Sequence, residues 1–274
     1  MKFIYILGLE HSGSTLTNHL LSRLPDSIGI GEATQFFSPK HMKYYMNRWG
    51  EYDGVRVCSC LKDWSDCDFW SELEPINGLS SNIDIKGKYR QLFNYVIKKY
   101  SNDAVVVDSS KSLQTISMLC EQAEFFGLRD ADIHIVFAVK DPREFAMSVI
   151  RKNQKKSLLS ILRAFNWWYS TNQKIFDYCL ERKHMVTISC YSELCNQPLE
   201  FLELVTKNAN INHDVIDLTK NNSKSHIAMG NKNFVLRNSD VIRYDDEWRS
   251  VWQIHFIAFV HFSARKLYQK LRTK

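Results

Sequence analysis

The chain has 274 residues, of which 45% are hydrophobic and 24% charged, and its formal net charge is +6. This size suits one large α/β domain, so we expect a single domain over residues 1–274. The sequence has no run of about 18 apolar residues and no signal-peptide core, which predicts no integral membrane segment and a cytoplasmic location. The mild positive charge favours an anionic ligand, but no basic segment interleaved with aromatics indicates nucleic acid.

The first residues predict a strand, a glycine loop and a helix. Residues 3–7 form a short apolar run, residues 8–14 are small and polar, and residues 15–24 carry leucines at helical spacing. The N–H groups of such a loop and of the helix start converge on one point, which favours a phosphate or a similar anion. The interval from Gly8 to Gly13 matches a P-loop, but Ser14 replaces the lysine that nucleotide hydrolysis requires. We therefore expect an anion-binding loop, and the missing lysine argues against a kinase or an ATPase.

A second strand is expected over residues 27–31, directly before Glu32. Ligands of open α/β sheets bind beyond the carboxyl ends of the strands, so Glu32 can reach the anion-binding loop. The following stretch, residues 36–100, is an insertion rich in aromatics with a helix over about residues 84–100. Its aromatic residues, Phe36 and Phe37 among them, can form part of an acceptor site or belong to the core.

Three of the seven cysteines cluster within this insertion, at Cys58, Cys60 and Cys67. The number of cysteines is odd, and they are too sparse for a disulfide scaffold, so a disulfide here stays an open question. A zinc site needs four ligands, and C-x-C with one further cysteine falls short of that number. We therefore predict no metal, and a folded surface loop that packs on Trp64 and neighbouring aromatics.

Two further strands are expected over residues 104–108 and 133–139, both buried and parallel because their apolar runs are continuous. Asp108 at the end of the first strand can hold Mg²⁺, which is the best argument for an NTPase such as a small-molecule kinase. After the second strand, Asp141 is a good N-cap and Pro142 suits the first helical position. Ser148 lies two helical turns beyond Asp141, so Lys140 and Ser148 can meet one anion.

A helix over residues 158–181 and a strand over residues 185–189 follow. Residues 244–273 should form helical segments whose apolar face packs on the sheet. That expected face comprises Phe256, Phe259, Val260, Ala264 and Leu267.

Six short motifs resemble those of sulfotransferases and occur in the family's order. They are His11-Ser12-Gly13-Ser14-Thr15, Gly31-Glu32, Asp108-Ser109-Ser110-Lys111, Lys140-Asp141-Pro142-Arg143 followed by Ser148, Tyr191-Ser192-Glu193-Leu194, and Gly230-Asn231. The resemblance implies a P-loop NTPase-like sulfotransferase fold, three α/β/α layers around a mainly parallel sheet. It also implies 3′-phosphoadenosine 5′-phosphosulfate (PAPS) as the donor, without a metal.

The resemblance assigns roles to the residues of these motifs. Glu32 takes the proton of the acceptor, Lys111 and the loop amides stabilise the sulfuryl group, and His11 contacts the leaving 5′-phosphate. The remaining nucleotide contacts fall to Ser12, Gly13, Ser14, Thr15, Lys140, Arg143, Ser148, Tyr191, Gly230 and Asn231. The sequence departs from the family pattern at His11, where Arg or Lys is usual, and at Lys140, where Arg is usual. It also departs at Ser192 and Glu193, within the family's Tyr-Glu-Asp-Leu segment.

The expected activity is sulfuryl transfer from PAPS to a hydroxyl, with a carbohydrate or a glycolipid as the acceptor. Two alternatives stay open at this point. One is a P-loop small-molecule kinase that uses Asp108, and the other is a catalytically inactive relative that binds a nucleotide or a glycan.

Overall fold

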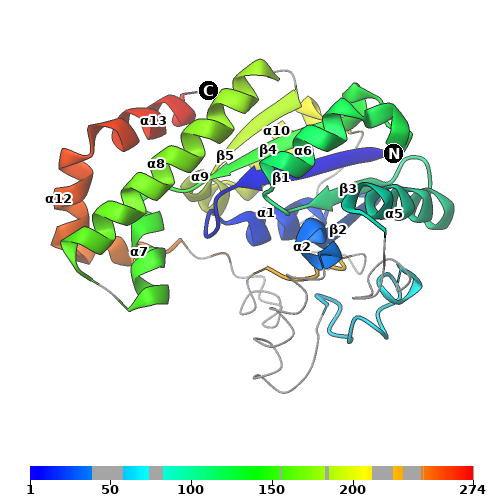
Figure 1. Cartoon of the computed structure of the whole chain (residues 1–274), viewed down its shortest axis with the longest axis horizontal. Coiled ribbons are helices and arrows are strands. Elements are labelled where there is room, and N and C mark those ends of the chain that lie inside the picture. The colour runs from blue at the N-terminus through cyan, green and yellow to red at the C-terminus, as the bar shows by residue number, and fades with distance from the viewer. Residues whose placement is uncertain are drawn as a thin grey trace.

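The computed structural model describes residues 1–38, 58–73, 83–154, 156–182, 185–211, 225–230, 242 and 244–273. Its centre is a five-stranded sheet in the order β2-β3-β1-β4-β5 (Figure 1). All four neighbouring pairs run parallel, which confirms the predicted sheet. The strands are β1 (Lys2–Gly8), β2 (Ser27–Gly31), β3 (Val105–Asp108), β4 (Ile133–Val139) and β5 (Val186–Cys190).

Helices connect these strands and cover both faces of the sheet (Figure 1). The first half of the chain contributes α1 (Ser14–Leu21), α2 (Ala33–Phe37), α5 (Ile85–Lys99) and α6 (Leu113–Glu121). The second half contributes α7 (Pro142–Asn153), α8 (Leu158–Glu181), α9 (Tyr191–Asn196), α10 (Pro198–Asn208), α12 (Trp252–Val260) and α13 (Phe262–Arg272). Short 3₁₀ turns are η1 (Ser71–Leu73), η2 (Ala123–Phe126), η3 (Asp130–Asp132) and η5 (Glu247–Ser250).

The side chains of β1 show why the fold has three layers. Phe3 and Tyr5 point into one core, which α5, α6, α7 and α8 cover, whereas Ile4 and Ile6 point into the other, beneath α1 and α10. Successive residues of a strand face opposite sides of the sheet, so a strand that is apolar throughout must be buried on both. The predicted three-layer α/β arrangement is confirmed.

Capping residues fix the starts of two helices, and the sequence predicted the cap at Asp141. The Asp141 carboxylate accepts a hydrogen bond from the Arg143 backbone N–H at 2.8 Å, and Pro142 is the first helical residue of α7. Asp84 caps α5 by accepting from the Gly87 N–H at 2.7 Å. Such caps satisfy N–H groups that have no partner within the helix.

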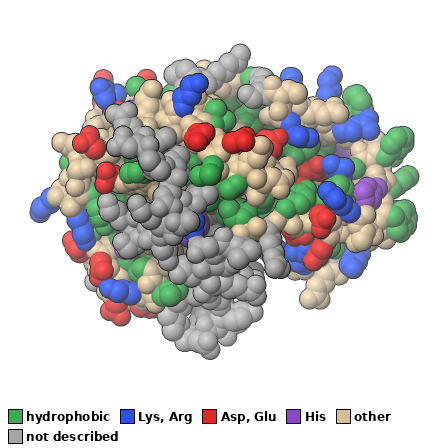
Figure 2. All heavy atoms as spheres, turned by 180° about the vertical axis from the view of Figure 1, so that it is seen from behind, with side chains coloured by type: hydrophobic (Ala, Val, Ile, Leu, Met, Phe, Trp, Pro, Cys, Tyr) green, Lys and Arg blue, Asp and Glu red, His purple; other side chains and the backbone are tan. Residues whose placement is uncertain are grey.

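The expected apolar face of the C-terminal segment was wrong in part. The helical segment breaks at His261, whose ring accepts from the Ala264 N–H at 3.2 Å and so begins a new helix, α13. This break changes which side of α12 faces inward, and Phe256, Phe259 and Val260 are 50%, 73% and 52% exposed. Hydrophobic side chains accordingly gather at the right-hand edge of Figure 2. Both helices pack mainly on α8, and α13 also contacts the edge strand β5.

Among the described helices, none combines the length and the apolar character that crossing a membrane requires.

The end of β2 is shaped by a close approach of two backbones. Gly31 has a φ of +76°, and a Cβ at this position would lie 2.2 Å from the carbonyl oxygen of Ala228. The next residue, Glu32, donates its N–H to the same oxygen at 3.0 Å. Only glycine fits between these backbones, and its conformation sets the direction in which Glu32 leaves the strand.

We expect Gly31→Ala to destabilise the protein by more than the ~1–2 kcal/mol that a left-handed backbone alone costs, because the methyl group also displaces Ala228. Urea unfolding followed by circular dichroism measures this loss. Gly127→Ala is the matched control, since Gly127 has a φ of +71° but a methyl group added there would meet nothing within 4 Å. Equal losses in the two variants would contradict the close approach.

Candidate active site

The anion-binding loop connects β1 to α1, and two of its glycines lie very close to neighbouring residues. A Cβ on Gly8 would lie 2.5 Å from the Ala138 carbonyl oxygen, and one on Gly13 would lie 2.5 Å from the Tyr191 ring. Gly13 and His11 both have left-handed backbones, with φ of 92° and 65°. The loop therefore forms where the sequence predicts it, with its backbone pressed against β4 and α9.

The loop offers hydrogen-bonding groups that other residues do not use. Ser12 is buried, and its hydroxyl has no hydrogen-bond partner within the described ranges. Gly13 precedes α1 without a side-chain cap, and the first turn of α1 carries no acidic residue. Because the first N–H groups of a helix lack partners within it, this end of α1 is suited to an anion.

Glu32 and Lys111 lie together beside this loop. The Lys111 ammonium forms an ion pair with the Glu32 carboxylate, and its Nζ also lies 3.5 Å from the Ser14 hydroxyl. Only 10% of the Lys111 side chain and 6% of the Glu32 side chain are exposed. Lys111 thus bridges the start of α1 and the carboxylate that follows β2.

The Asp108 carboxylate stabilises the turn that carries Lys111. One oxygen of its carboxylate accepts from the Ser110 N–H at 2.7 Å, and the other accepts from the Tyr89 hydroxyl at 2.6 Å. Burial raises the pKa of Asp108 to about 6, although these hydrogen bonds oppose the shift. Both oxygens are engaged within the protein, which argues against the Mg²⁺ ligand that a kinase would need.

A second buried cation lies on the other side of the loop. The Lys140 ammonium is 3.4 Å from the Ser148 hydroxyl and 4.3 Å from the centre of the Tyr191 ring. The Trp168 indole donates to the Lys140 carbonyl oxygen at 2.8 Å and so fixes the backbone there. Burial lowers the pKa of Lys140. The Tyr191 ring also packs against Gly13, so Lys140 and the anion-binding loop lie on either side of the same tyrosine.

Arg143 is held in place by two neighbours. Its Nε and one terminal nitrogen donate to the Asp141 carboxylate at 2.9 and 2.6 Å. Its guanidinium also lies 4.2 Å from the centre of a Trp248 ring. These contacts place Arg143 at the start of α7, and the nucleotide contact that the sequence predicts for it stays a prediction.

Gly230 reaches the same region from a distant part of the chain. A Cβ on Gly230 would lie 3.0 Å from the Thr15 hydroxyl and 3.9 Å from a Glu32 carboxylate oxygen. Its segment, residues 225–230, runs beside β2, where Gly31 pairs with Ala228. Asn231, the other predicted residue of this motif, lies outside the described residues.

Sequence reasoning missed three residues that support the site. Tyr89 and Trp168 fix Asp108 and Lys140 from helices far away in the sequence. Ala228 receives the backbone N–H of Glu32. All three act through contacts between distant segments, for which a single sequence carries no local signal.

The aromatics expected at the acceptor site divide into two sets. Phe36 and Phe37 are each 1% exposed, so both belong to the core. The remaining ones before the cysteines, from Tyr44 to Tyr52, lie outside the described residues.

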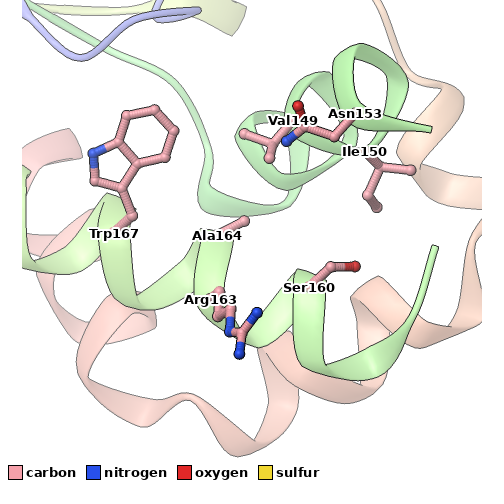
Figure 3. A pocket seen from close by; sticks show the side chains of 7 residues that line it. All are labelled: Val149, Ile150, Asn153, Ser160, Arg163, Ala164 and Trp167. Carbon is pink, nitrogen blue, oxygen red and sulfur yellow. The ribbon is translucent and has the colours of Figure 1, made fainter. Parts of the chain in front are cut away.

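A separate pocket of about 690 Å³ lies between the end of α7 and the start of α8 (Figure 3). It is lined by Val149, Ile150, Asn153, Ser160, Arg163, Ala164 and Trp167. No predicted site residue lines this pocket, so we do not assign it to the candidate active site.

Solved structures with the same architecture are sulfotransferase domains. The sulfotransferase domain of the Synechococcus PCC 7002 olefin synthase superposes with a TM-score of 0.62 at 17% identity, over 95% of this chain and 94% of that domain. The sulfotransferase domain from the curacin biosynthetic pathway superposes with a TM-score of 0.55 at 16% identity, over 94% of this chain and 96% of that domain. No protein-family model and no curated protein matches the sequence. The chain therefore has the sulfotransferase fold, as its motifs predicted.

His11 provides a probe of the charge in this site. Burial, together with the nearby ammonium groups of Lys152, Lys140 and Lys111, lowers its pKa to about 4. The imidazole of the protein without a ligand is therefore neutral at pH 7.

We expect saturating inorganic sulfate to raise the pKa of His11 by about one to three units, since an adjacent negative charge favours the imidazolium. Sulfate affinity should then fall as pH rises through the raised pKa. A pH titration of the histidine ring signals by NMR measures both pKa values. His134 is the control, because burial lowers its pKa to about 4 as well while it lies on β4 against Thr187. A sulfate effect of equal size on both rings would refute an anion site beside His11.

Proposed function

We propose that this protein is a sulfotransferase that moves the sulfuryl group of PAPS to a hydroxyl, with a carbohydrate or a glycolipid as the acceptor. The observation that carries the proposal is the position of Lys111. Its ammonium lies between Ser14, at the start of α1, and the Glu32 carboxylate. A cation and a base thus meet at the point where a transferred anionic group would lie.

The proposed reaction is an in-line displacement at sulfur. The acceptor oxygen forms a bond to sulfur while the bond from sulfur to the 5′-phosphate oxygen breaks, and that oxygen keeps the electron pair. Glu32 accepts the acceptor's proton, which an aliphatic hydroxyl must lose as its new bond forms. Lys111 and the N–H groups at the start of α1 stabilise charge on the sulfuryl and phosphate oxygens.

The ion pair makes the base depend on the donor. In the protein alone, Lys111 neutralises Glu32, and both side chains are almost fully buried. An anionic sulfuryl group beside Ser14 competes for the same ammonium, because Ser14 lies 3.5 Å from its Nζ. Donor binding therefore shifts Lys111 from Glu32 toward the loop and leaves the carboxylate ready to take a proton.

Lys140 supports the assignment of the 3′-phosphate. It is 8% exposed, and among the described residues its ammonium forms no direct ion pair, although the carboxylates of Glu144 and Asp245 act on it from further away. A buried cation without a direct ion pair is costly, so the site is suited to an anion that binds Lys140 and Ser148 together. The 3′-phosphate is the group that distinguishes PAPS from ATP. We also propose a cytoplasmic location for the protein.

The proposal is tested first by ligand choice and then by turnover. Adenosine 3′,5′-bisphosphate should raise the melting temperature, whereas ATP with Mg²⁺ should not; stabilisation by ATP with Mg²⁺ alone would indicate a kinase. Release of adenosine 3′,5′-bisphosphate from PAPS is then measured over a panel of sugars, glycolipids and phenols. Binding without a sulfated product from any acceptor would indicate an inactive relative.

Glu32→Gln keeps the shape of the side chain and removes the proton acceptor. We expect turnover to fall by about 10²–10⁴, while the affinity for adenosine 3′,5′-bisphosphate stays within a few fold. Calorimetry and single-turnover kinetics separate the two effects. Turnover that survives in this variant would show that another group takes the proton.

Lys140→Ala should weaken the binding of adenosine 3′,5′-bisphosphate far more than that of adenosine 5′-phosphate, because only the first ligand carries the 3′-phosphate. A lost charge-assisted contact of about 1.5–3 kcal/mol corresponds to roughly a tenfold to hundredfold loss of affinity. Isothermal titration of both ligands against both proteins gives the comparison. If the two ligands lose equally, Lys140 does not bind the 3′-phosphate.

A further inference from the structure

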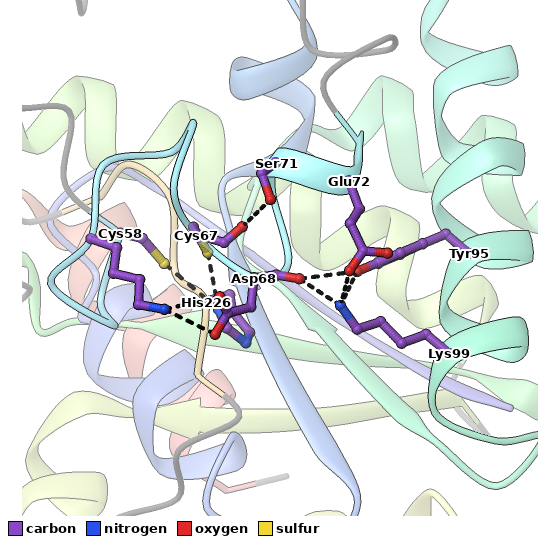
Figure 4. A network of polar contacts seen from close by, with 9 residues as sticks. Cys58, Cys67, Asp68, Ser71, Glu72, Tyr95, Lys99 and His226 are labelled. Carbon is purple, nitrogen blue, oxygen red and sulfur yellow. Dashed lines mark hydrogen bonds and ion pairs between the residues drawn. The ribbon is translucent and has the colours of Figure 1, made fainter.

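A cluster of three cysteines and one histidine lies outside the anion-binding loop. This Cys/His cluster comprises Cys58, Cys60, Cys67 and His226, whose ligand atoms all lie within 4.8 Å of one another. The Sγ atoms of Cys67 and Cys58 are 3.2 and 3.9 Å from the Nδ1 of His226 (Figure 4). The sequence alone suggested only three ligands, because His226 follows Cys67 by 159 residues.

These distances agree with four ligands around one tetrahedral ion. Zinc binds thiolate sulfur at about 2.3 Å and imidazole nitrogen at about 2.0–2.1 Å, which puts neighbouring ligand atoms roughly 3.5–3.8 Å apart. All three cysteines are free thiols, so no disulfide uses their sulfur atoms. An iron–sulfur cluster would insert several iron and sulfide atoms between the ligands and hold them further apart.

The surroundings of the cluster are those of a closed site. Cys58 and Cys67 are fully buried, and His226 is 7% exposed. Backbone N–H groups of Phe69 and Trp70 donate to the Cys67 sulfur, which stabilises a thiolate. The Phe69 ring stacks on His226 at 5.2 Å with an interplanar angle of 14°, and this fixes the direction of the imidazole.

We propose that the Cys/His cluster binds one Zn²⁺ ion as a structural site. Three thiolates and one imidazole fill all four positions of a tetrahedral ion, so no position remains for a substrate or a reactive water. This proposal differs from the prediction made from the sequence, which was a surface loop without a metal. The inference does not rest on the proposed transfer reaction.

Zinc at this position would tie two distant segments to the sheet. Residues 58–73 are anchored on α5, where Lys99 donates to the Asp68 carbonyl oxygen at 2.5 Å (Figure 4). Residues 225–230 run along β2, since the His226 N–H donates to the Gly29 carbonyl oxygen at 2.8 Å. Gly230 of the second segment lies beside Glu32. The ion would therefore hold in place the backbone that covers Glu32.

The first test measures metal content in the purified full chain. We expect about one zinc per chain by mass spectrometry of the wild-type protein. Substitution by Co²⁺ should give the visible absorption of a tetrahedral thiolate site. Cys60→Ala should reduce the zinc content at least tenfold, whereas Cys120→Ala should leave it unchanged. Both cysteines are half-buried free thiols, and Cys120 lies on α6 outside the cluster.

Three results would overturn the proposal. One is a wild-type protein that contains less than about a tenth of an equivalent of zinc and gives no Co²⁺ spectrum after reconstitution. Another is a disulfide between Cys58 and Cys67 in the freshly purified protein. The third is a Cys60→Ala variant that keeps a full equivalent of zinc. None of these measurements depends on catalysis, so failure of the proposed transfer reaction would leave the zinc site standing.

A second measurement tests the structural role. Removal of the ion by a chelator should increase amide hydrogen exchange of residues 225–230 at least tenfold, while β4 at the centre of the sheet keeps its protection. Addition of Zn²⁺ should restore the protection in the wild-type protein but not in Cys60→Ala. Exchange that is the same with and without the ion would show that zinc does not hold this segment.

Discussion

Parallel pairing of all five strands is the constraint on which the candidate site depends. Since the strands run in one direction, their carboxyl ends meet at one edge of the sheet, which is where α/β folds bind ligands. Here β1 leads into the anion-binding loop, and β2 leads into Glu32. Lys111 and Lys140 follow the ends of β3 and β4, and Tyr191 follows the end of β5. Every strand thus contributes to one site, although the residues are spread over most of the chain.

The burial of charge at this edge is handled in three different ways. Lys111 is paired with Glu32, so neither charge is isolated. His11 stays neutral because burial and nearby cations lower its pKa to about 4. Lys140 has the hydroxyl of Ser148 and the ring face of Tyr191 as neighbours, and these solvate a cation without neutralising it. A bound anion would stabilise the ammonium of Lys140, in agreement with the nucleotide contact that we propose for it.

The sequence predicted what short segments determine. Strands β2 and β4 and helix α8 have the predicted bounds, because continuous apolar runs and helical spacing are local signals. The Asp141 cap is local as well. Outward-facing Phe256 and Phe259 escaped prediction, since a break at His261 changes the helical phase. The partners of Asp108 and of the cysteines also escaped prediction, because Tyr89 and His226 approach them only in the folded chain.

The segment over residues 225–230 connects the two unusual regions of this protein. At one end, His226 belongs to the Cys/His cluster, and at the other, Gly230 lies against Thr15 and Glu32. Between them, Ala228 pairs with Gly31, where no side chain larger than a hydrogen fits. Backbone hydrogen bonds join this segment to Gly29 and Ile30 of β2 and to Ser59, and its central residues are buried. A rigid anchor at His226 therefore bears on the placement of Glu32, although the two residues lie on different segments.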